Sequence, residues 1–431
     1  MTRIILLILL FFAAPLRAQT EIVELTSPGG INAWLVEDHS IPFVALELRF
    51  KGGGTLDLAK RGGMNLMVHT LEEGAGALDA QGFAAAREAI AAQIGFDVGD
   101  DTVSVSVRFL SETREEAMAL LRLALIEPRF DDAAIERVRQ QILSGIRSDQ
   151  KDPDAIASQV FDARAFGAHP YGSSIDGSEE SVKALNRDDL VEAHRGAFAL
   201  DRVYAAAAGD ITAHELGLLL DDLLGDLPKT GRPFSGDIAV KSDGGVHVVP
   251  FDTPQSVALF GHQGLERDHP DFFTAYVLNQ ILGGSGFEAR LMTELREKRG
   301  LTYGIYSYLV PKDHAALVMG HVASANDRIA EAIEVIRAEW VKMAQNGVSA
   351  EELDAAKTYL TGAYPLRFDG NGPIAQILVG MQMQGLGPEY VENRNAMVEA
   401  VTLGDIRRVA KELLRPETLS FVVVGQPEGF D

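Results

Sequence analysis

The sequence predicts an α+β protein of two homologous domains of about 210 residues, each a mainly antiparallel sheet with helices packed on it. We expect the two domains to face each other as a clamshell. Three observations predict this fold: segments that recur at nearly constant spacing, strands marked by alternating apolar residues, and helices marked by capping-box spacings. The expected divisions are a signal peptide (1–18), an N-terminal domain (19–225), a linker (226–245) and a C-terminal domain (246–431).

Three segments of the first half recur in the second half in the same order. The matching pairs are residues 67–76 with 277–286, residues 131–144 with 349–362, and residues 203–209 with 419–425. Their offsets all lie between roughly 210 and 218 residues, which chance agreement does not explain. The recurring segments therefore indicate an internal duplication.

Alternating patterns and capping signals predict the individual elements. Val, Leu and Phe alternate with polar or small residues over 44–50 and 103–109, as in half-buried strands. Capping-box spacings predict three helix starts, at Thr113 with Glu116, Thr212 with Glu215 and Ser349 with Glu352. The helix from Thr113 is expected to end before Pro128. Residues 225–236 are rich in Gly, Pro and Ser without periodicity, so they predict a linker or hinge.

The first 18 residues have the pattern of a secretory signal peptide. Arg3 precedes an apolar run over 4–16, and the small Ala18 precedes the polar Gln19. The alternative is an uncleaved anchor, although the run is shorter than the ~20 residues that a membrane span needs. We expect a periplasmic or otherwise secreted protein with no membrane insertion after cleavage.

Composition narrows the functional classes. The chain has no cysteine, which excludes thiol catalysis and thiolate metal sites. Its 62 acidic residues outnumber 39 basic ones, a net charge of −23 that repels nucleic acid. Simple solubility accounts for this charge, so no nucleic-acid partner is expected.

The first half resembles the pitrilysin/insulinase peptidase family along nearly its whole length. The family's landmarks are an early strand that ends in glycines, an active-site helix, a serine-rich strand and a helix pair. They resemble, in that order, residues 50–54, 62–74, 102–110 and 113–147. Family members carry H-x-x-E-H on the active-site helix, where two imidazoles and a distant Glu hold zinc and the motif Glu acts as base.

This zinc motif is degenerate here. Counted from the flanking glycines, Asn65 replaces the first His and Val68 replaces the Glu, so only His69 remains. The family's distant Glu corresponds to Ser144 or Gly145, neither of which is a carboxylate. A single imidazole cannot hold zinc and valine cannot accept a proton, so the resemblance implies no metal and no catalytic residue on this chain.

A shifted register of the motif is an alternative. His69, Glu72 and Glu73 form H-x-x-E-E, and a His with two carboxylates is a possible metal set. That register leaves only Asp149 downstream. The simpler interpretation is that His69 is an ordinary partly buried side chain and that the two glutamates are a solvated helix end.

The second half keeps an element that resembles the family's C-terminal Arg…Tyr pair. Arg296 and Tyr303 have the family's seven-residue spacing, and in the family this pair reaches substrate held at the zinc of the other half. A surface Arg and a strand Tyr are the alternative. The glycines within 283–286 lack a following Lys-Ser/Thr, so they are no phosphate loop and instead predict close backbone approach.

The resemblance implies the non-catalytic, substrate-binding subunit of a heteromeric zinc metallopeptidase that degrades peptides. The partner would be a catalytic subunit bearing H-x-x-E-H and zinc, and the chain alone is expected to be inactive. Two other classes stay open: a structural or binding protein with a peptidase-like fold, as in respiratory-complex core subunits, and an independently active, divergent metallopeptidase.

Overall fold

The computed structural model describes residues 21–57, 60–286 and 288–430. The expected signal peptide lies outside the described residues. Among the helices within those three ranges, none is long and apolar enough to cross a membrane.

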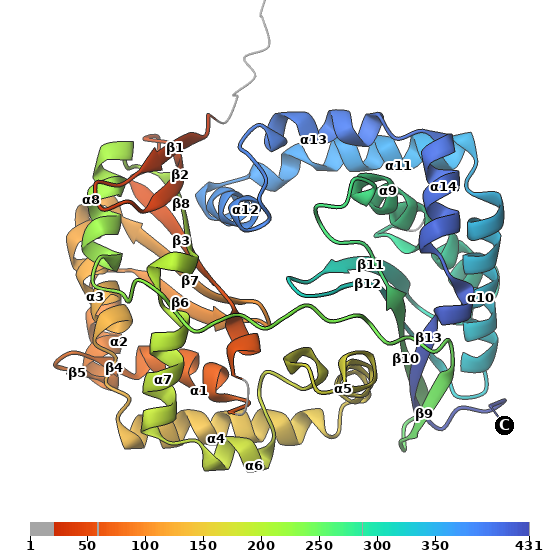
Figure 1. Ribbon diagram of the computed structural model, residues 1–431, viewed down its shortest axis with the longest axis horizontal. Helices are drawn as coiled ribbons and strands as arrows, with labels where there is room; N and C mark the ends of the chain where they lie inside the picture. The colour runs from red at the N-terminus through yellow and green to blue at the C-terminus, as the bar shows by residue number, and fades with distance from the viewer. Residues whose placement is uncertain (1–20, 58–59, 287, 431) are drawn as a thin grey trace, which may run out of the picture.

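The first half is built on a six-stranded sheet in the order β1-β2-β8-β3-β7-β6 (Figure 1). Its strands are β1 Val23–Thr26, β2 Asn32–Glu37, β3 Phe43–Lys51, β6 Gln93–Val98, β7 Thr102–Leu110 and β8 Val203–Gly209, with a small hairpin of β4 Gly74–Ala75 and β5 Leu78–Asp79. Its helices are α1 Gly63–Thr70, α2 Ala80–Ala89, α3 Arg114–Ile126, α4 Asp132–Asp149, α5 Pro153–Phe166, α6 Glu179–Ala184, α7 Arg187–Ala197 and α8 Ala213–Leu224.

The second half is built on a five-stranded sheet in the order β11-β12-β10-β13-β9. Its strands are β9 Val246–Pro250, β10 Gln255–Gln263, β11 Ile305–Pro311, β12 Ala316–Ala325 and β13 Ser420–Gly425. Its helices are α9 Phe272–Gly283, α10 Ile329–Asn346, α11 Ala350–Ala363, α12 Asn371–Met383, α13 Tyr390–Glu399 and α14 Leu403–Leu413. A π-helical turn, Met292–Glu297, precedes β11.

The two sheets repeat one topology. In the first, β3 pairs antiparallel with β7 and β8, and β8 pairs parallel with β2. In the second, β10 pairs antiparallel with β12 and β13, and β13 pairs parallel with β9. The predicted α+β class and the duplication are thereby confirmed.

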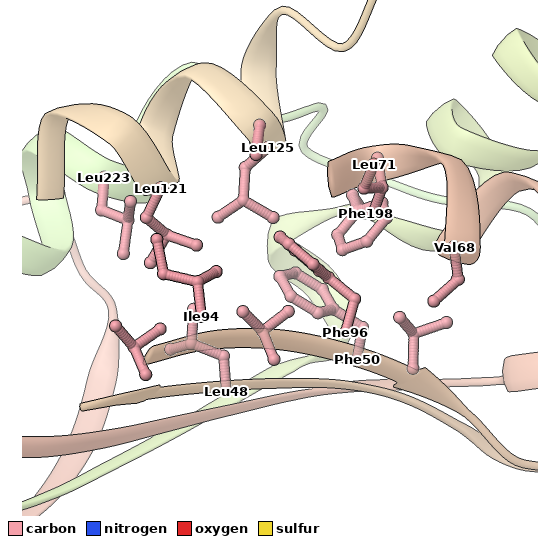
Figure 2. Close-up of a cluster of buried hydrophobic side chains, with 14 of the residues drawn as sticks. Leu48, Phe50, Val68, Leu71, Ile94, Phe96, Leu121, Leu125, Phe198 and Leu223 are labelled. Atoms are coloured by element: carbon pink, nitrogen blue, oxygen red, sulfur yellow. The ribbon is translucent and has the colours of Figure 1, made fainter. Parts of the chain in front are cut away.

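Helices α1, α3, α7 and α8 cover one face of the first sheet and enclose its main core (Figure 2). Leu48 and Phe50 of β3 point into this core, where the Phe50 ring meets that of Phe198, the residue directly after α7, edge-on at 4.8 Å between centroids. Buried and more exposed side chains alternate along β7, as predicted, and Val103, Val105 and Val107 are among the buried ones.

The other face of each sheet is covered by a helix that comes from the opposite half. Helix α12 packs on β3 and β8, and α5 packs on β10 and β13. Ala45 and Glu47 of β3, which the alternation predicts to be exposed, are therefore 1% and 2% exposed. The half-buried interpretation of this strand was wrong because local alternation does not reveal a helix supplied from more than 300 residues away.

The two halves also meet at the tips of equivalent hairpins. Lys312 of the β11–β12 turn forms an ion pair with Asp100 of the β6–β7 turn, and the backbone N–H of Asp313 donates to Asp101 at 3.2 Å. The Tyr171 hydroxyl donates to the same Asp101 at 2.5 Å. Residues 226–245 contain no helix or strand.

Helices begin directly after Thr113, Thr212 and Ser349, as predicted, but only two of the three predicted capping boxes form. Thr212 and Ser349 each form the expected capping box. Thr113 forms none, because a short 3-10 turn precedes α3 and the Thr113 hydroxyl donates to the Ile90 carbonyl at 3.2 Å instead.

Candidate functional site

The counterpart of the family's active-site helix is α1, and its start is fixed by a buried carboxylate. Asp57 accepts the backbone N–H groups of Gly62 at 3.0 Å and Met64 at 2.7 Å, which satisfies donors at the helix N-terminus. Burial raises the pKa of Asp57 to about 6. Gly62 has φ of 92°, and a Cβ there would lie 2.7 Å from the Asp176 carbonyl oxygen, so glycine is required.

Two positions of the zinc motif serve the packing of the helix. The Asn65 amide is 4% exposed and donates to Asp176 Oδ1 at 2.6 Å. Val68 is fully buried and lies in the core with Leu71 and Phe198 (Figure 2). The position that carries the base in the family is thus an apolar contact with the sheet.

His69 is exposed, so its predicted partial burial was wrong. Burial raises the pKa of Asp176, and repulsion by Asp149 adds to that effect, while the nearby His69 opposes it. Asp176, Asp149 and His69 therefore form a polar cluster. The Asp176 carboxylate in this cluster also accepts a hydrogen bond from the Asn65 amide.

The downstream positions of the motif supply no ligand. Ser144 and Gly145 are exposed on α4. Ser144 lines an open hollow of about 580 Å³ together with Arg147, Ser148, Lys151, Asp152 and Pro153. Two cations repel a divalent metal and only one carboxylate attracts it, so these residues do not fit the three-ligand zinc site.

The two glutamates of the alternative motif, H-x-x-E-E, form ion pairs with arginines. Glu72 forms an ion pair with Arg87, and Glu73 forms one with Arg137. Over the described ranges, no group of three or more His, Asp or Glu side chains that could hold a metal ion is found. The carboxylates of H-x-x-E-E therefore bind guanidinium groups.

Arg296 and Tyr303 lie on either side of the turn that leads into β11. Arg296 is half-buried on the π-helical turn, and its carbonyl accepts the Gly300 N–H at 3.0 Å. Tyr303 is 88% exposed, so its phenol is not used in core packing. The predicted close approach at the glycine cluster is confirmed, because a Cβ on Gly283 would lie 2.5 Å from Ser307 Oγ of β11.

A second pocket was not anticipated from the sequence. It has a volume of about 450 Å³ and lies between α9, α12, α13 and β11. Its arginines and tyrosines come from segments spread over more than 100 residues, so no local spacing marks them. The lining of this pocket contains three arginines and no Asp or Glu among the described residues, an excess that becomes apparent only in the folded chain.

Comparisons with known proteins indicate the same family as the sequence does. Residues 184–360 match the family model described as "Peptidase M16 inactive domain". A Helicobacter pylori protein named "Non-peptidase homolog YmxG" is 26% identical over 391 residues, 90% of each chain. An "Uncharacterized zinc protease" of Mycobacterium tuberculosis is 25% identical and covers 82% of this chain and 81% of its own.

A solved structure agrees over nearly the whole length. The crystal structure of a peptidase M16 inactive domain from Pseudomonas fluorescens has a TM-score of 0.89 and 27% identity, and covers 95% of this chain and 98% of that one. With the degenerate zinc motif, these matches define the class. Over nearly its whole length the chain is similar to inactive homologues of the M16 peptidases, and the pitrilysin/insulinase resemblance is confirmed.

Proposed function

We propose that the chain is the non-catalytic, substrate-binding subunit of a periplasmic heteromeric zinc metallopeptidase that degrades peptides. Its partner is a catalytic M16 subunit that bears H-x-x-E-H and zinc, and the two halves of this chain face each other as a clamshell. The observation that carries the proposal is a contrast between the halves. The first half has buried its former catalytic position, Val68, in the core, while the second half presents Tyr303 almost fully to solvent.

Arg296 and Tyr303 act in this proposal on substrate held at the partner's zinc. A guanidinium donates charge-assisted hydrogen bonds to a peptide carbonyl or to the oxyanion that develops on it. A phenol adds one neutral donor. An exposed Tyr303 costs nothing in stability to keep for such a role, since a large aromatic side chain normally contributes through burial.

The test is the activity of the reconstituted pair on a quenched fluorescent peptide. Arg296→Ala should lower kcat/KM by about 10²-fold or more, the scale of removing one transition-state donor. Tyr303→Phe should lower it by roughly three- to tenfold, because one neutral hydrogen bond contributes about 0.5–1.5 kcal/mol. Both variants should fold and assemble as the native chain does.

Two matched controls keep the result specific. Arg328→Ala removes an exposed arginine of the same half that pairs with Glu331, and Tyr359→Phe removes a hydroxyl from a tyrosine that is 48% exposed. Neither change should alter kcat/KM. Full activity of the Arg296→Ala complex would make the subunit a scaffold with no role in catalysis.

A further inference from the structure

The pocket between α9, α12, α13 and β11 has a charge opposite to that of the whole chain. The chain carries 62 acidic and 39 basic residues. The residues described around this pocket include Arg267, Arg367 and Arg394 but no Asp or Glu. Aromatic rings and three amide side chains make up much of the remaining wall. A concave site with a few polar groups among aromatic ones is the usual form of a small-ligand site.

Arg394 is a buried cation held only by neutral groups. The residue is 4% exposed. Its guanidinium donates to the Leu360 carbonyl at 2.6 Å, to Asn395 Oδ1 at 3.0 Å and to the Tyr276 hydroxyl at 3.3 Å. Among the carboxylates in the described part of the chain, none forms an ion pair with it. Buried charges are normally paired, so this one is available to an anion.

Arg267 is held at the same pocket by aromatic rings. Its guanidinium carbon lies 4.4 Å from the centroid of Phe272 and 5.6 Å from that of Tyr390. It donates to Gln384 Oε1 at 3.1 Å and to the Tyr390 hydroxyl at 3.2 Å. A guanidinium stacked in this way keeps its charge and its planar donor geometry, which suit a carboxylate.

Tyr364 supplies an unused donor. The residue is 8% exposed, and its hydroxyl is buried without a hydrogen-bond partner among the described residues. Burial raises the pKa of Tyr364 to about 12, so the hydroxyl keeps its proton at neutral pH. A buried hydroxyl without a partner is costly, and a ligand oxygen in the pocket would satisfy it.

The duplication places this pocket at a specific point of the repeat. Helices α9 and α11 are the second-half counterparts of α1 and α4, the helices that carry the degenerate zinc motif. Tyr364 directly follows α11 and Tyr276 lies on α9. The second half thus has buried arginine and tyrosine donors next to the helix pair whose first-half copy carries the degenerate zinc motif.

We propose that this pocket binds the carboxylate of a ligand with an aromatic or aliphatic body, and that the ligand is the free carboxyl end of a peptide. Arg267 and Arg394 supply the charge, the Tyr364 hydroxyl donates to a carboxylate oxygen, and the rings of Phe272 and Tyr276 contact the apolar body. The volume of about 450 Å³ suits the last two or three residues of a peptide. The peptide source rests on the proposed function, whereas the carboxylate does not.

The test is calorimetric titration of the isolated chain with three probes. These are an N-acetylated tripeptide ending in phenylalanine as the free acid, the same peptide as its carboxyl-terminal amide, and 3-phenylpropanoate. The acid should bind at least about tenfold more tightly than the amide, the effect of losing one charge-assisted contact. A weaker 3-phenylpropanoate identifies the peptide end as the ligand, and an equally tight one replaces the peptide by a small carboxylic acid.

Variants decide whether the binding belongs to this pocket. Arg267→Gln should weaken binding of the acid about tenfold or more, while the exposed-site control Arg328→Gln should leave it unchanged. Tyr364→Phe should weaken binding about three- to tenfold without lowering Tm, because its hydroxyl has no partner to lose. Equal binding of acid and amide, no binding of any probe, or an unchanged Arg267→Gln variant would overturn the proposal. None of these results depends on Arg296 or on the zinc-bearing partner.

Discussion

Replacing Val68 with Glu restores the residue type that a zinc peptidase uses as its base, and the structure predicts that it destabilises the fold. Val68 is fully buried in the core of the first half. A carboxylate placed there is charged only at high cost, so it takes up a proton and its pKa rises. Taking up that proton costs about 1.4 kcal/mol for each pH unit above the ordinary Glu pKa near 4.3.

This reasoning sets the magnitude. Relative to Val68→Gln, which has the same shape without a charge, Val68→Glu should lose up to about 3.7 kcal/mol of unfolding free energy at pH 7 and about 1 kcal/mol at pH 5. The sign follows from the raised pKa: the folded state is favoured at low pH, and that stability is lost as pH rises from about 4.3 toward the folded value. Urea unfolding of both variants at the two pH values, followed by tryptophan fluorescence, measures the difference.

One result would refute the reasoning. If the two variants differ equally at pH 5 and pH 7, the introduced carboxylate reaches solvent and position 68 does not belong to the core. A Val68→Met variant adds no titratable group, so any change in its stability relative to the native chain should be the same at both pH values.

Three further predictions concern zinc binding, a buried histidine of the second half and the glycines within 283–286. The isolated chain should hold no stoichiometric zinc by metal analysis, and one tightly bound zinc that is lost in His69→Ala would contradict the interpretation of the motif. Burial lowers the pKa of His262 to about 4 from its ordinary value of 6.5, so the native chain should lose about 2 kcal/mol more stability between pH 7 and pH 5 than His262→Gln does, as acid protonates the unfolded state first. Gly283→Ala should cost about 1–3 kcal/mol because its Cβ would lie 2.5 Å from Ser307 Oγ, whereas Gly304→Ala, with nothing within 4 Å, should cost less in the same thermal unfolding assay.

The fold could be predicted from the sequence, whereas the arginine–aromatic pocket of the second half could not. Duplicated segments and alternating strands are local signals repeated at fixed spacing, so the two sheets were predictable. The loss of the zinc motif was also readable, since it depends on a few positions of one helix. The environment of those positions could not be predicted, because the hydrogen bond from the Asn65 amide to Asp176 joins segments 111 residues apart.

The arginine–aromatic pocket shows why the remainder needed a structure. Arg267, Tyr364 and Arg394 are unremarkable in the sequence, where they lie far apart and belong to no recognisable motif. Their common feature is a pocket lining without Asp or Glu among the described residues, which is a property of three-dimensional neighbours and not of spacing. The same reason explains the error at Glu47, whose burial depends on a helix far along the chain.

The exchange of α5 and α12 makes the two halves one interlocked unit. Each half, if produced alone, would lack the helix that covers the inner face of its own sheet and would expose residues such as Ala206 and Val424. The connecting segment is itself fastened, as the backbone N–H of Lys241 donates to Ala165 and that of Ile238 to His314, both at 2.9 Å. A protease that cut this segment would therefore leave two fragments that purify together as a single particle.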